Sequence, residues 1–282
     1  MSQCLETNSH SLVEIPPNEW SILLELYKER RTEPSGYNLI NNCIKWIEKE
    51  PDFDVKCLSL DGDWKNDGTF LMIVINDVKY KFVYFNTLSN NLKRLSNALL
   101  CLSYTDGHYK LHDYGERLLP AVEDYKRSAL NEDVQTTQTA WYKAPREIVA
   151  HFSTDPPVGI SLRSLDTEDI LTVNNLWRYG TEYTVKFIRR LILYNVSVGA
   201  FDTDGKLVAC CLRLPIGALG VLHVLDSHRR LGLGSLMVRC LAKKISKLGD
   251  EVLAPVVKEN IASRKMFEKL GFQMIDYIYW TG

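Results

Sequence analysis

The fold is decided by one stretch of the chain, LHVLDSHRRLGLGS at residues 222–235. Its first residues predict a strand, and the residues after the glycines predict an amphipathic helix. A turn between a strand and a helix leaves backbone N–H groups pointing outward at the helix amino terminus, where an anion can bind. Gly232 and Gly234 let the backbone approach a phosphate, and Arg229 and Arg230 add positive charge. The sequence therefore predicts a pyrophosphate-binding turn, against the alternative of a flexible turn with solvated arginines.

Two common phosphate motifs do not fit this turn. The dinucleotide fingerprint G-x-G-x-x-G fails because Met237 stands where its third glycine is required. A P-loop fails because no Gly-Lys-Ser/Thr sequence follows the glycines. The class of ligand has to come from the surrounding order of elements.

The second half of the chain predicts a regular order of elements around the turn. The expected elements are strand 159–165, helices 167–179 and 182–194, strands 196–201 and 206–213 joined by a hairpin at 202–205, strand 219–225, the helix after the turn, strand 251–257, helix 260–270 and strand 272–280. The helix after the turn carries an apolar stripe and ends at Gly249.

The first half predicts a second α+β unit. Helical spacing is expected around residues 20–27 and over 37–46, strands over 55–60, 69–75 and 79–85 with a hairpin at Asn76-Asp77, and helices over 88–102 and 116–127. This half carries no chemical signature, but its alternation of helices and hairpin strands makes it a candidate for a degenerate copy of the second half.

A stretch of weak periodicity separates the two units. Residues 136–139 read Thr-Thr-Gln-Thr, and Asp155-Pro156-Pro157 disfavours both helix and central strand. We expect an amino-terminal domain over 1–135, a linker over 136–158 and the functional domain over 159–282. Only five of the sixteen glycines precede Gly159, which also places a glycine-rich ligand site in the second half.

Composition excludes several classes of function. The net charge is -1, with 34 basic against 35 acidic residues, so neither nucleic acid nor a membrane surface is an expected partner. The seven cysteines show no zinc-ligand spacing, so no metal is expected and the thiols should be reduced. No apolar stretch reaches the ~20 residues of a membrane span. No presequence is evident, so a cytoplasmic location is expected.

The stretch at 222–235 resembles the central motif of the GNAT acyltransferase superfamily, whose signature is R/Q-x-x-G-x-G/A. Residues 260–272 resemble its next motif, in which an asparagine precedes a helix ending Y-E-K-L-G-F; here the helix ends FEKLGF. Residues 165–190 look like the glycine N-acyltransferase-like family, which also has an amino-terminal α+β domain and for which a mitochondrial location is open. The resemblance implies a mixed, mostly antiparallel sheet flanked by helices.

The resemblance also implies a cofactor and its binding residues. Acyl-CoA, acetyl-CoA or a larger thioester, would lie between strands 219–225 and 251–257, with its pantetheine arm pairing with the backbone of Leu222 and Val224. The backbone N–H of Val224 would polarise the thioester carbonyl. Asn260 would steady the pantetheine arm. The N–H groups that would hold the pyrophosphate belong to Arg230, Leu231, Gly232, Leu233, Gly234 and Ser235, beside Arg229.

The sequence departs from the superfamily pattern at the position of the general acid. Many members have a tyrosine where this chain has Phe267, and phenylalanine cannot protonate the departing thiolate. A thiol with a pKa of ~8.5 leaves without a positioned acid at a cost of about 2 kcal/mol, so this change slows the reaction without forbidding it. The alternative role of Phe267 is core packing.

The base is open. The position at which the glycine family's carboxylate aligns reads Ala218. His223 lies beside the expected thioester, with Asp226 and His228 just beyond it, and any of the three could accept a proton. The alternative is a packed strand histidine and two turn residues. Glu182 is a weaker candidate, more typical of a first-turn acid.

Two aromatic residues and two cysteines complete the candidates. Trp177 and Tyr179 would flank the acceptor cleft by the same resemblance, although aromatics at helical spacing are typical of core. Cys210 and Cys211 sit within a strand without a base nearby, so buried packing is expected for them.

The predicted function is direct transfer of an acyl group from CoA to a small primary amine, with an amino acid such as glycine expected. Without a base, an α-amine of pKa ~8 costs about 1.4 kcal/mol to deprotonate at neutral pH, against roughly 4.6 for a lysine. The alternatives are a catalytically weak acyl-CoA-binding module and a protein N-acetyltransferase. The oligomeric state is left open.

Overall fold

The computed structural model describes residues 10–75, 81–103, 109–129 and 135–282. The hairpin expected at Asn76-Asp77 lies outside these residues. The first half contains β1 (Leu12–Glu14), α1 (Trp20–Leu26), α2 (Tyr37–Lys49), β2 (Val55–Leu60), β3 (Phe70–Ile75), β4 (Lys81–Asn86), α3 (Lys93–Ser103), β5 (Tyr109–Gly115), α4 (Leu119–Ala129) and β6 (Thr136–Ala144).

The second half repeats this order of elements after the short helix α5 (Arg146–Ala150). It contains β7 (Ser161–Arg163), α6 (Ile170–Leu176), α7 (Val185–Tyr194), β8 (Ser197–Phe201), β9 (Leu207–Arg213), β10 (Leu219–Val224), α8 (Leu233–Lys247), β11 (Val252–Val257), α9 (Ile261–Lys269) and β12 (Gln273–Thr281). In both halves a strand and two helices precede three strands, and a helix, a strand, a helix and a last strand follow. The expected α+β architecture with a mostly antiparallel sheet is confirmed.

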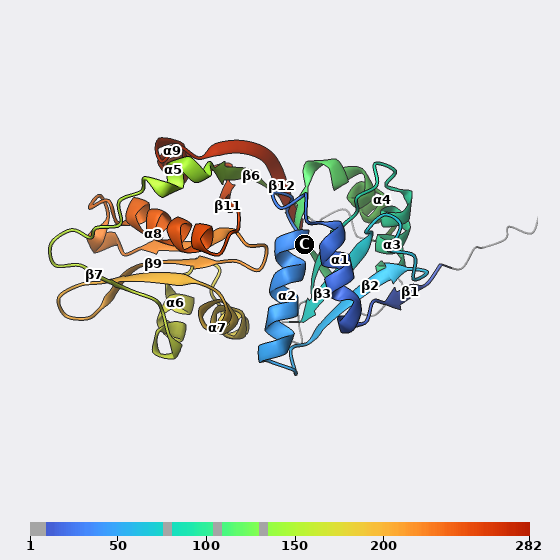
Figure 1. Ribbon diagram of the computed structural model, residues 1–282, viewed down its shortest axis with the longest axis horizontal. Helices are drawn as coiled ribbons and strands as arrows, with labels where there is room; N and C mark the ends of the chain where they lie inside the picture. The colour runs from blue at the N-terminus through green and yellow to red at the C-terminus, as the bar shows by residue number, and fades with distance from the viewer. Residues whose placement is uncertain (1–9, 76–80, 104–108, 130–134) are drawn as a thin grey trace, which may run out of the picture.

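The strands of the described residues form two sheets that divide the second half. One has the order β1-β2-β3-β4-β5-β12-β6-β11 and the other β10-β9-β8-β7. In Figure 1, α6 and α7 cover one face of the second-half strands, and α8, α9 and α5 lie on the opposite face. β9 is buried along its whole length because helices cover both of its faces, which explains its continuous run of apolar residues.

The last strands of the two halves are exchanged. β12 pairs with β5 of the first half, opposing Ile278 to Gly115, and β6 pairs with β11 of the second half, opposing Tyr142 to Ala254. β12 and β6 then pair with each other. Each half therefore completes its sheet with a strand from the other.

The stretch 136–158, expected as a linker, is ordered structure at its start. Residues 136–144 form β6, and Thr139 and the three residues after it are buried between β11 and β12. The sequence of β6 does not alternate between apolar and polar residues because both faces of the strand are covered. Threonine, which is β-branched, is favoured in such a strand. Only the residues after α5 have the irregular structure that the prolines predict.

One hydrophobic core crosses from the first half to the second. It joins residues of α1 and α2, such as Trp20 and Trp46, to Leu191 of α7 and Leu212 of β9. Separate clusters lie under α8 and α9 and under α3 and α4. Burial of this shared surface, rather than a flexible connection, holds the halves together.

Polar contacts fix α2 against the second half. Asn42 Nδ2 donates to the carbonyl oxygens of Leu214 and Pro215 in the β9–β10 turn. Glu50, just after α2, pairs with Arg190 of α7 at 3.0 Å. The first half thus supports the elements that precede β10.

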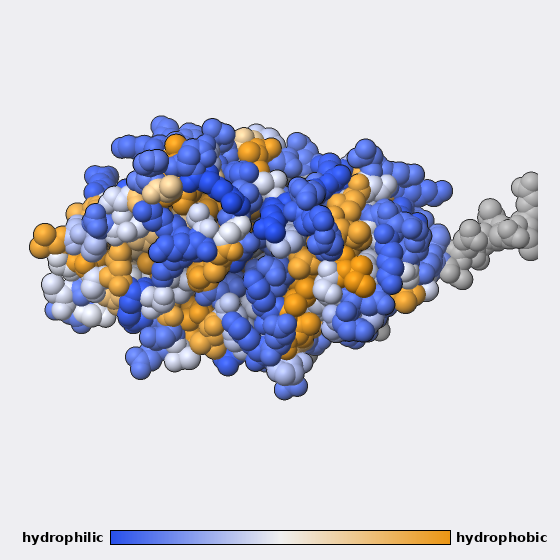
Figure 2. All heavy atoms as spheres, in the orientation of Figure 1, coloured by the Kyte–Doolittle hydropathy of each residue, from blue (hydrophilic) through white to orange (hydrophobic). Residues whose placement is uncertain are grey.

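The visible surface is mostly hydrophilic, with hydrophobic patches interspersed, some of them over the region of α1 and α2 (Figure 2). Among the described residues, no helix is both long and apolar enough to span a bilayer. In the same part of the chain, no group of three or more His, Cys, Asp or Glu side chains is placed to hold a metal ion.

Candidate functional site

The two sheets separate between β10 and β11. β10 is the edge strand of one sheet and β11 is the edge strand of the other, and the two strands lie in contact without pairing in the described structure. Their facing backbone groups are therefore available to a ligand. An extended chain could insert between them as an additional strand, which is the geometry that the resemblance implies for the pantetheine arm.

A bulge shapes β10 ahead of the site. The pairing with β9 shifts between Gly220 and His223, and Val221 has a left-handed backbone with φ 49°. A β-branched residue in this conformation is strained, and such strain is concentrated at functional sites. After the bulge, Leu222 and Val224 pack partly against the α8 side, while His223 opposes Cys210.

The turn after β10 presents unpaired backbone donors. Arg230 and Gly232 both have left-handed backbones, with φ 65° and 78°. Among the described residues, no acceptor bonds to the N–H groups from Arg230 to Ser235, and the first helical bond of α8 runs from Leu236 N to Gly232 O. Consecutive N–H groups in such a turn form a concave anion site at a helix amino terminus. The turn thus has left-handed residues and open N–H donors, and its binding of a pyrophosphate stays a prediction.

The two glycines of the turn serve different purposes. A Cβ on Gly232 would meet no atom within 4 Å, so the requirement there is the positive φ. A Cβ on Gly234 would lie 3.4 Å from Met266 Sδ and 3.7 Å from Val224 Cγ2. A large side chain at position 234 would therefore fill the space between β10 and α9.

Asn260 caps α9 beside this space. Its Oδ1 accepts a hydrogen bond of 3.1 Å from Ser263 N, which satisfies one of the free N–H groups of the helix. Its amide nitrogen has no partner among the described residues and can donate. The role predicted for Asn260 is compatible with this position and stays a prediction.

The electrostatics around His223 favour a neutral imidazole. Burial lowers the pKa of His223, the positive charge of Arg229 lowers it further, and Asp226 opposes them. Asp226 itself pairs with Arg229 at 2.7 Å on the exposed turn, and Ser227 Oγ and His228 Nδ1 are 2.9 Å apart. Of the three candidate bases, His223 is the one that lies partly buried on the strand. Asp226 and His228 are instead engaged within the turn.

Phe267 lies in the core under α9. It is 5% exposed, stacks on Tyr142 at 6.2 Å between ring centroids and contacts Phe272 edge to face at 4.9 Å. These contacts favour the packing role. Tyr142 itself accepts a hydrogen bond from Arg264 and donates one of 2.9 Å to Glu268, and sequence reasoning missed it because it lies on β6.

The predicted acceptor residues lie in the loop after α6. Trp177 is half-buried and stacks on Phe187 at 5.8 Å, whereas Tyr179 is 47% exposed and meets Trp177 edge to face. A Cβ on Gly180 would lie 1.8 Å from Asn174 O, so only glycine permits this tight loop. Trp177 therefore serves packing, and Tyr179 is the residue that a ligand could reach.

The remaining candidates occupy structural positions. Cys210 and Cys211 are fully buried in β9, and burial raises the pKa of Cys210 to about 12, so neither is a nucleophile at neutral pH. The core position predicted for these cysteines is confirmed. Ala218 is also buried, and Glu182 opens a short helical turn at the surface before α7.

The first half has a turn in the same place of its order, after β4, in which side chains of the turn accept several of the backbone N–H groups. Side-chain oxygens of Asn86, Thr87, Ser89 and Asn91 accept from the backbone N–H groups of Thr87, Ser89, Asn91 and Lys93 in turn, at 2.8–3.2 Å. The guanidinium of Arg117, just before α4, donates to Asn86 Oδ1 and to the carbonyl of Thr87. Four N–H groups of this turn are therefore engaged by its own side chains, whereas no side chain among the described residues accepts from the turn after β10.

A protein segment also fills the first-half space between β4 and β5. Ser35 Oγ donates to the carbonyl of Asp113 at 2.7 Å, and Asn86 Nδ2 donates to the carbonyl of Pro34 at 3.0 Å. The loop between α1 and α2 thereby bonds to both strands where they diverge. Among the described residues, no loop bonds in this way to both β10 and β11.

Comparison with known proteins identifies this architecture. Residues 197–281 match the family model described as FR47-like protein. A Drosophila protein solved by structural genomics superposes with a TM-score of 0.84 at 22% identity, covering 97% of this chain and 98% of that one. A tandem GNAT protein from the clavulanic acid biosynthesis pathway superposes with a TM-score of 0.61 at 15% identity, over 97% and 98% of the two chains.

The chain has a tandem GNAT fold. A GCN5-related N-acetyltransferase from Sphaerobacter thermophilus shares it at a TM-score of 0.57 and 11% identity, over 97% of this chain and 95% of that one. A search of curated protein sequences finds no match. The tandem GNAT fold explains the repeated order of elements in the two halves.

Proposed function

We propose that the chain is an acyl-CoA-dependent N-acyltransferase whose active site lies in residues 159–282. The observation that carries the proposal is the turn after β10, where the N–H groups from Arg230 to Ser235 have no acceptor among the described residues. A diphosphate is suited to this site because it offers several oxygens to successive donors at the amino terminus of α8.

The residues beside the turn support a direct transfer. The amine nitrogen attacks the thioester carbonyl, and the N–H of Val224 stabilises the negative charge that develops on the carbonyl oxygen. The carbon–sulfur bond then breaks, and the thiolate leaves and takes a proton from water, since Phe267 cannot supply one. The amine loses its proton to His223, whose lowered pKa keeps the imidazole neutral and able to accept it.

The proposed acceptor is a small primary amine, an amino acid such as glycine. Support comes from the resemblance of residues 165–190 to the glycine N-acyltransferase-like family and from the lower cost of deprotonating an α-amine than a lysine. Exposed Tyr179 stands at the edge of the proposed acceptor cleft.

The test is calorimetric titration with CoA together with release of free CoA from acetyl-, benzoyl- and longer acyl-CoAs against a panel of amines. We expect binding and amine-dependent release in the wild type, and loss of both in Gly234→Trp with an unchanged melting temperature. Wild-type affinity in Gly234→Trp would refute the placement of the site. Asp204→Trp, at the exposed turn between β8 and β9, is the matched control.

A second candidate function is an acyl-CoA-binding module without turnover. The buried phenylalanine at position 267 and the buried alanine at position 218 favour it, because both stand where catalytic groups are expected. CoA binding without release of CoA by any amine would establish the module and exclude the enzyme. Release with peptide amines alone would indicate a protein N-acetyltransferase instead.

The role of His223 has its own test. If His223 accepts the proton, the rate rises with pH through its pKa, which lies below the ordinary histidine value. His223→Gln should remove this acidic limb and lower the rate about 10²-fold. An unaltered pH–rate profile would exclude His223 as the base.

A further inference from the structure

A pocket of about 420 Å³ opens beside the turn, between α8, the end of α9 and the irregular segment after α5. It is lined by Asp155, Pro157, Leu231, Gly232, Ser235, Leu236, Arg239, Lys269 and Leu270. Gly232 and Ser235 belong both to this pocket and to the proposed pyrophosphate turn. A ligand bound to the turn could therefore extend into the pocket without crossing protein atoms.

The pocket has an unpaired cationic lining. Arg239 Nε is buried and has no hydrogen-bond partner, and neither Arg239 nor Lys269 forms an ion pair with any described carboxylate. A buried donor left without an acceptor is costly, and a bound anion is one way to satisfy it. The hydroxyl of Ser235 adds a further donor. The one carboxylate of the lining, Asp155, is exposed and accepts from Ser153 Oγ at 3.1 Å.

We propose that this pocket binds a phosphate monoester, the phosphate on the ribose of CoA, through Arg239 and Lys269. The proposal rests on the proposed function, since the diphosphate of CoA on the turn would bring the ribose to the pocket. A dianion matches two cations, and guanidinium with ammonium can contact separate phosphate oxygens. The pocket then distinguishes CoA from the same molecule without this phosphate.

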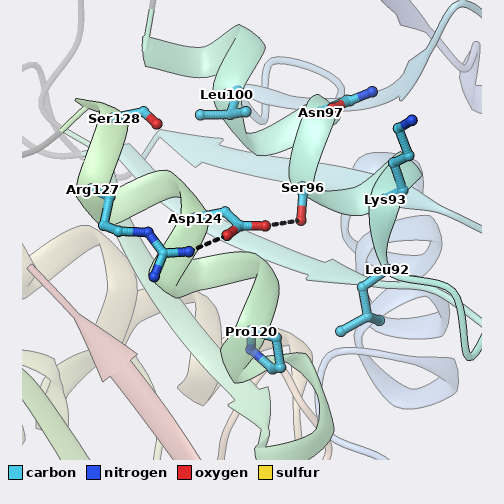
Figure 3. A pocket seen from close by; sticks show the side chains of 9 residues that line it. All are labelled: Leu92, Lys93, Ser96, Asn97, Leu100, Pro120, Asp124, Arg127 and Ser128. Carbon is cyan, nitrogen blue, oxygen red and sulfur yellow. Dashed lines mark hydrogen bonds and ion pairs between the residues drawn. The ribbon is translucent and has the colours of Figure 1, made fainter.

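The first half provides the contrast. A pocket of about 430 Å³ lies between α3 and α4, the helices that correspond to α8 and α9. Figure 3 shows Asp124 between Arg127 and Ser96; Arg127 pairs with its carboxylate, and Ser96 Oγ donates to it at 3.0 Å. Asp124 thus neutralises the arginine of this pocket, whereas Lys93, its other cation, forms no ion pair among the described residues. Variants in this first-half pocket therefore serve as controls for variants in the second-half pocket.

The experiment measures the dissociation constants of CoA and of dephospho-CoA, which lacks the ribose phosphate, by calorimetry on the full chain. We expect the wild type to bind CoA at least about tenfold more tightly than dephospho-CoA. Arg239→Gln and Lys269→Gln should each remove most of this ratio by weakening CoA and leaving dephospho-CoA unchanged. Lys93→Gln, in the first-half pocket, should change neither constant. Because Lys269 is exposed, Lys269→Gln tests the proposal even if Arg239→Gln fails to fold.

Three outcomes would overturn the inference while leaving the proposed function intact. The first is equal affinity of the wild type for CoA and dephospho-CoA. The second is an equal loss of both ligands in Lys269→Gln. The third is binding of inorganic phosphate that competes with neither ligand, which would assign the pocket to a separate anion. Failure of both CoA and dephospho-CoA to bind the wild type would instead refute the proposed function.

Discussion

The turns after β4 and β10 occupy the same place in the two halves of the molecule, yet they satisfy their backbone donors in opposite ways. After β4, side chains of the turn itself accept the N–H groups of four alternate residues from Thr87 to Lys93, and Arg117 bonds to the turn from outside. After β10, left-handed residues at 230 and 232 turn the N–H groups outward, and no described residue accepts them. A repeated fold thus supplies the position, and the residues of each turn decide whether a ligand is needed there.

The comparison extends to what fills each groove. The first half closes the gap between β4 and β5 with its own loop through Pro34 and Ser35, and it neutralises its helix pocket with Asp124. In the part of the second half that the structure describes, β10 and β11 do not pair with each other, and Arg239 and Lys269 form no ion pair. We interpret the first half as the structural partner, because it donates β6 and α2 to the half that carries the proposed site.

The largest expected effect concerns the exchanged strands. A chain of residues 159–282 lacks β6, so β11 loses its only described partner and β12 loses both of its neighbours. We expect no cooperative thermal transition in circular dichroism for this chain. A chain of residues 136–282 keeps β6 and should regain strand signal, although the face that α2 covers stays exposed. A full cooperative transition in 159–282 would show that the expected linker is dispensable.

The second prediction concerns the left-handed residue of the binding turn. Gly232→Val forces a β-branched residue to φ 78°, which costs about 1–2 kcal/mol and turns the N–H groups away. We expect CoA affinity to fall at least about 30-fold by calorimetry, whereas Gly232→Asn, which tolerates this conformation, should stay within about threefold. Equal losses in both variants would mean that the side chain, not the backbone, causes the effect.

The third prediction addresses the first-half turn. Arg117→Met removes the donors to Asn86 and Thr87 and leaves Glu33 without this partner, so the free energy of unfolding should fall by about 2 kcal/mol. CoA affinity should not change, because the network lies outside the proposed site. The stability control is Arg229→Met, whose ion pair with Asp226 is exposed and should contribute little to unfolding in urea. A loss of CoA affinity in Arg117→Met would contradict the assignment of separate roles.

The smallest expected effect concerns the ion pair between Glu50 and Arg190, which joins the two halves. The hydrogen bond from Arg190 lowers the pKa of Glu50, so the unfolded chain binds protons at this group more readily than the folded chain. This contribution to stability is present above the ordinary glutamate pKa and is lost as pH falls below it toward the lowered folded-state pKa. Urea unfolding of Glu50→Gln should therefore show a shallower decline of stability with acid than the wild type. If stability declines equally with acid in the two proteins, the ion pair of Glu50 with Arg190 contributes nothing to the pH dependence of unfolding.

The elements of the second half could be predicted closely from sequence. Helix α7 has its apolar residues at helical spacing, with Ile188, Leu191 and Ile192 buried, and the helix after the turn starts at Leu233 as the glycines indicate. The expected helix 167–179 was too long, since α6 ends at Leu176 and Trp177 is already extended. Just after the end of α6, the chain turns back so that Gly180 packs closely against Asn174 of the same helix.

Three other features could not be read from the chain. Strands β1, β5 and β6 were not predicted, because a strand whose pairing depends on distant residues shows no reliable local period. The stacking of Tyr142 on Phe267 joins residues 125 positions apart. The unpaired Nε of Arg239 is visible only once α9 and the segment after α5 close over α8.

Sequence by itself determined the α+β class, the order of the second-half elements and the turn at 228–234, because glycine conformation and helical periodicity are local properties. Tertiary structure alone decided that the halves exchange their last strands, that Phe267 and Trp177 belong to packing, and that side chains accept N–H groups in the first of the two equivalent turns but not, among the described residues, in the second. These depend on which groups meet across the chain, and hydrogen-bond satisfaction can be counted only when the acceptors are in place.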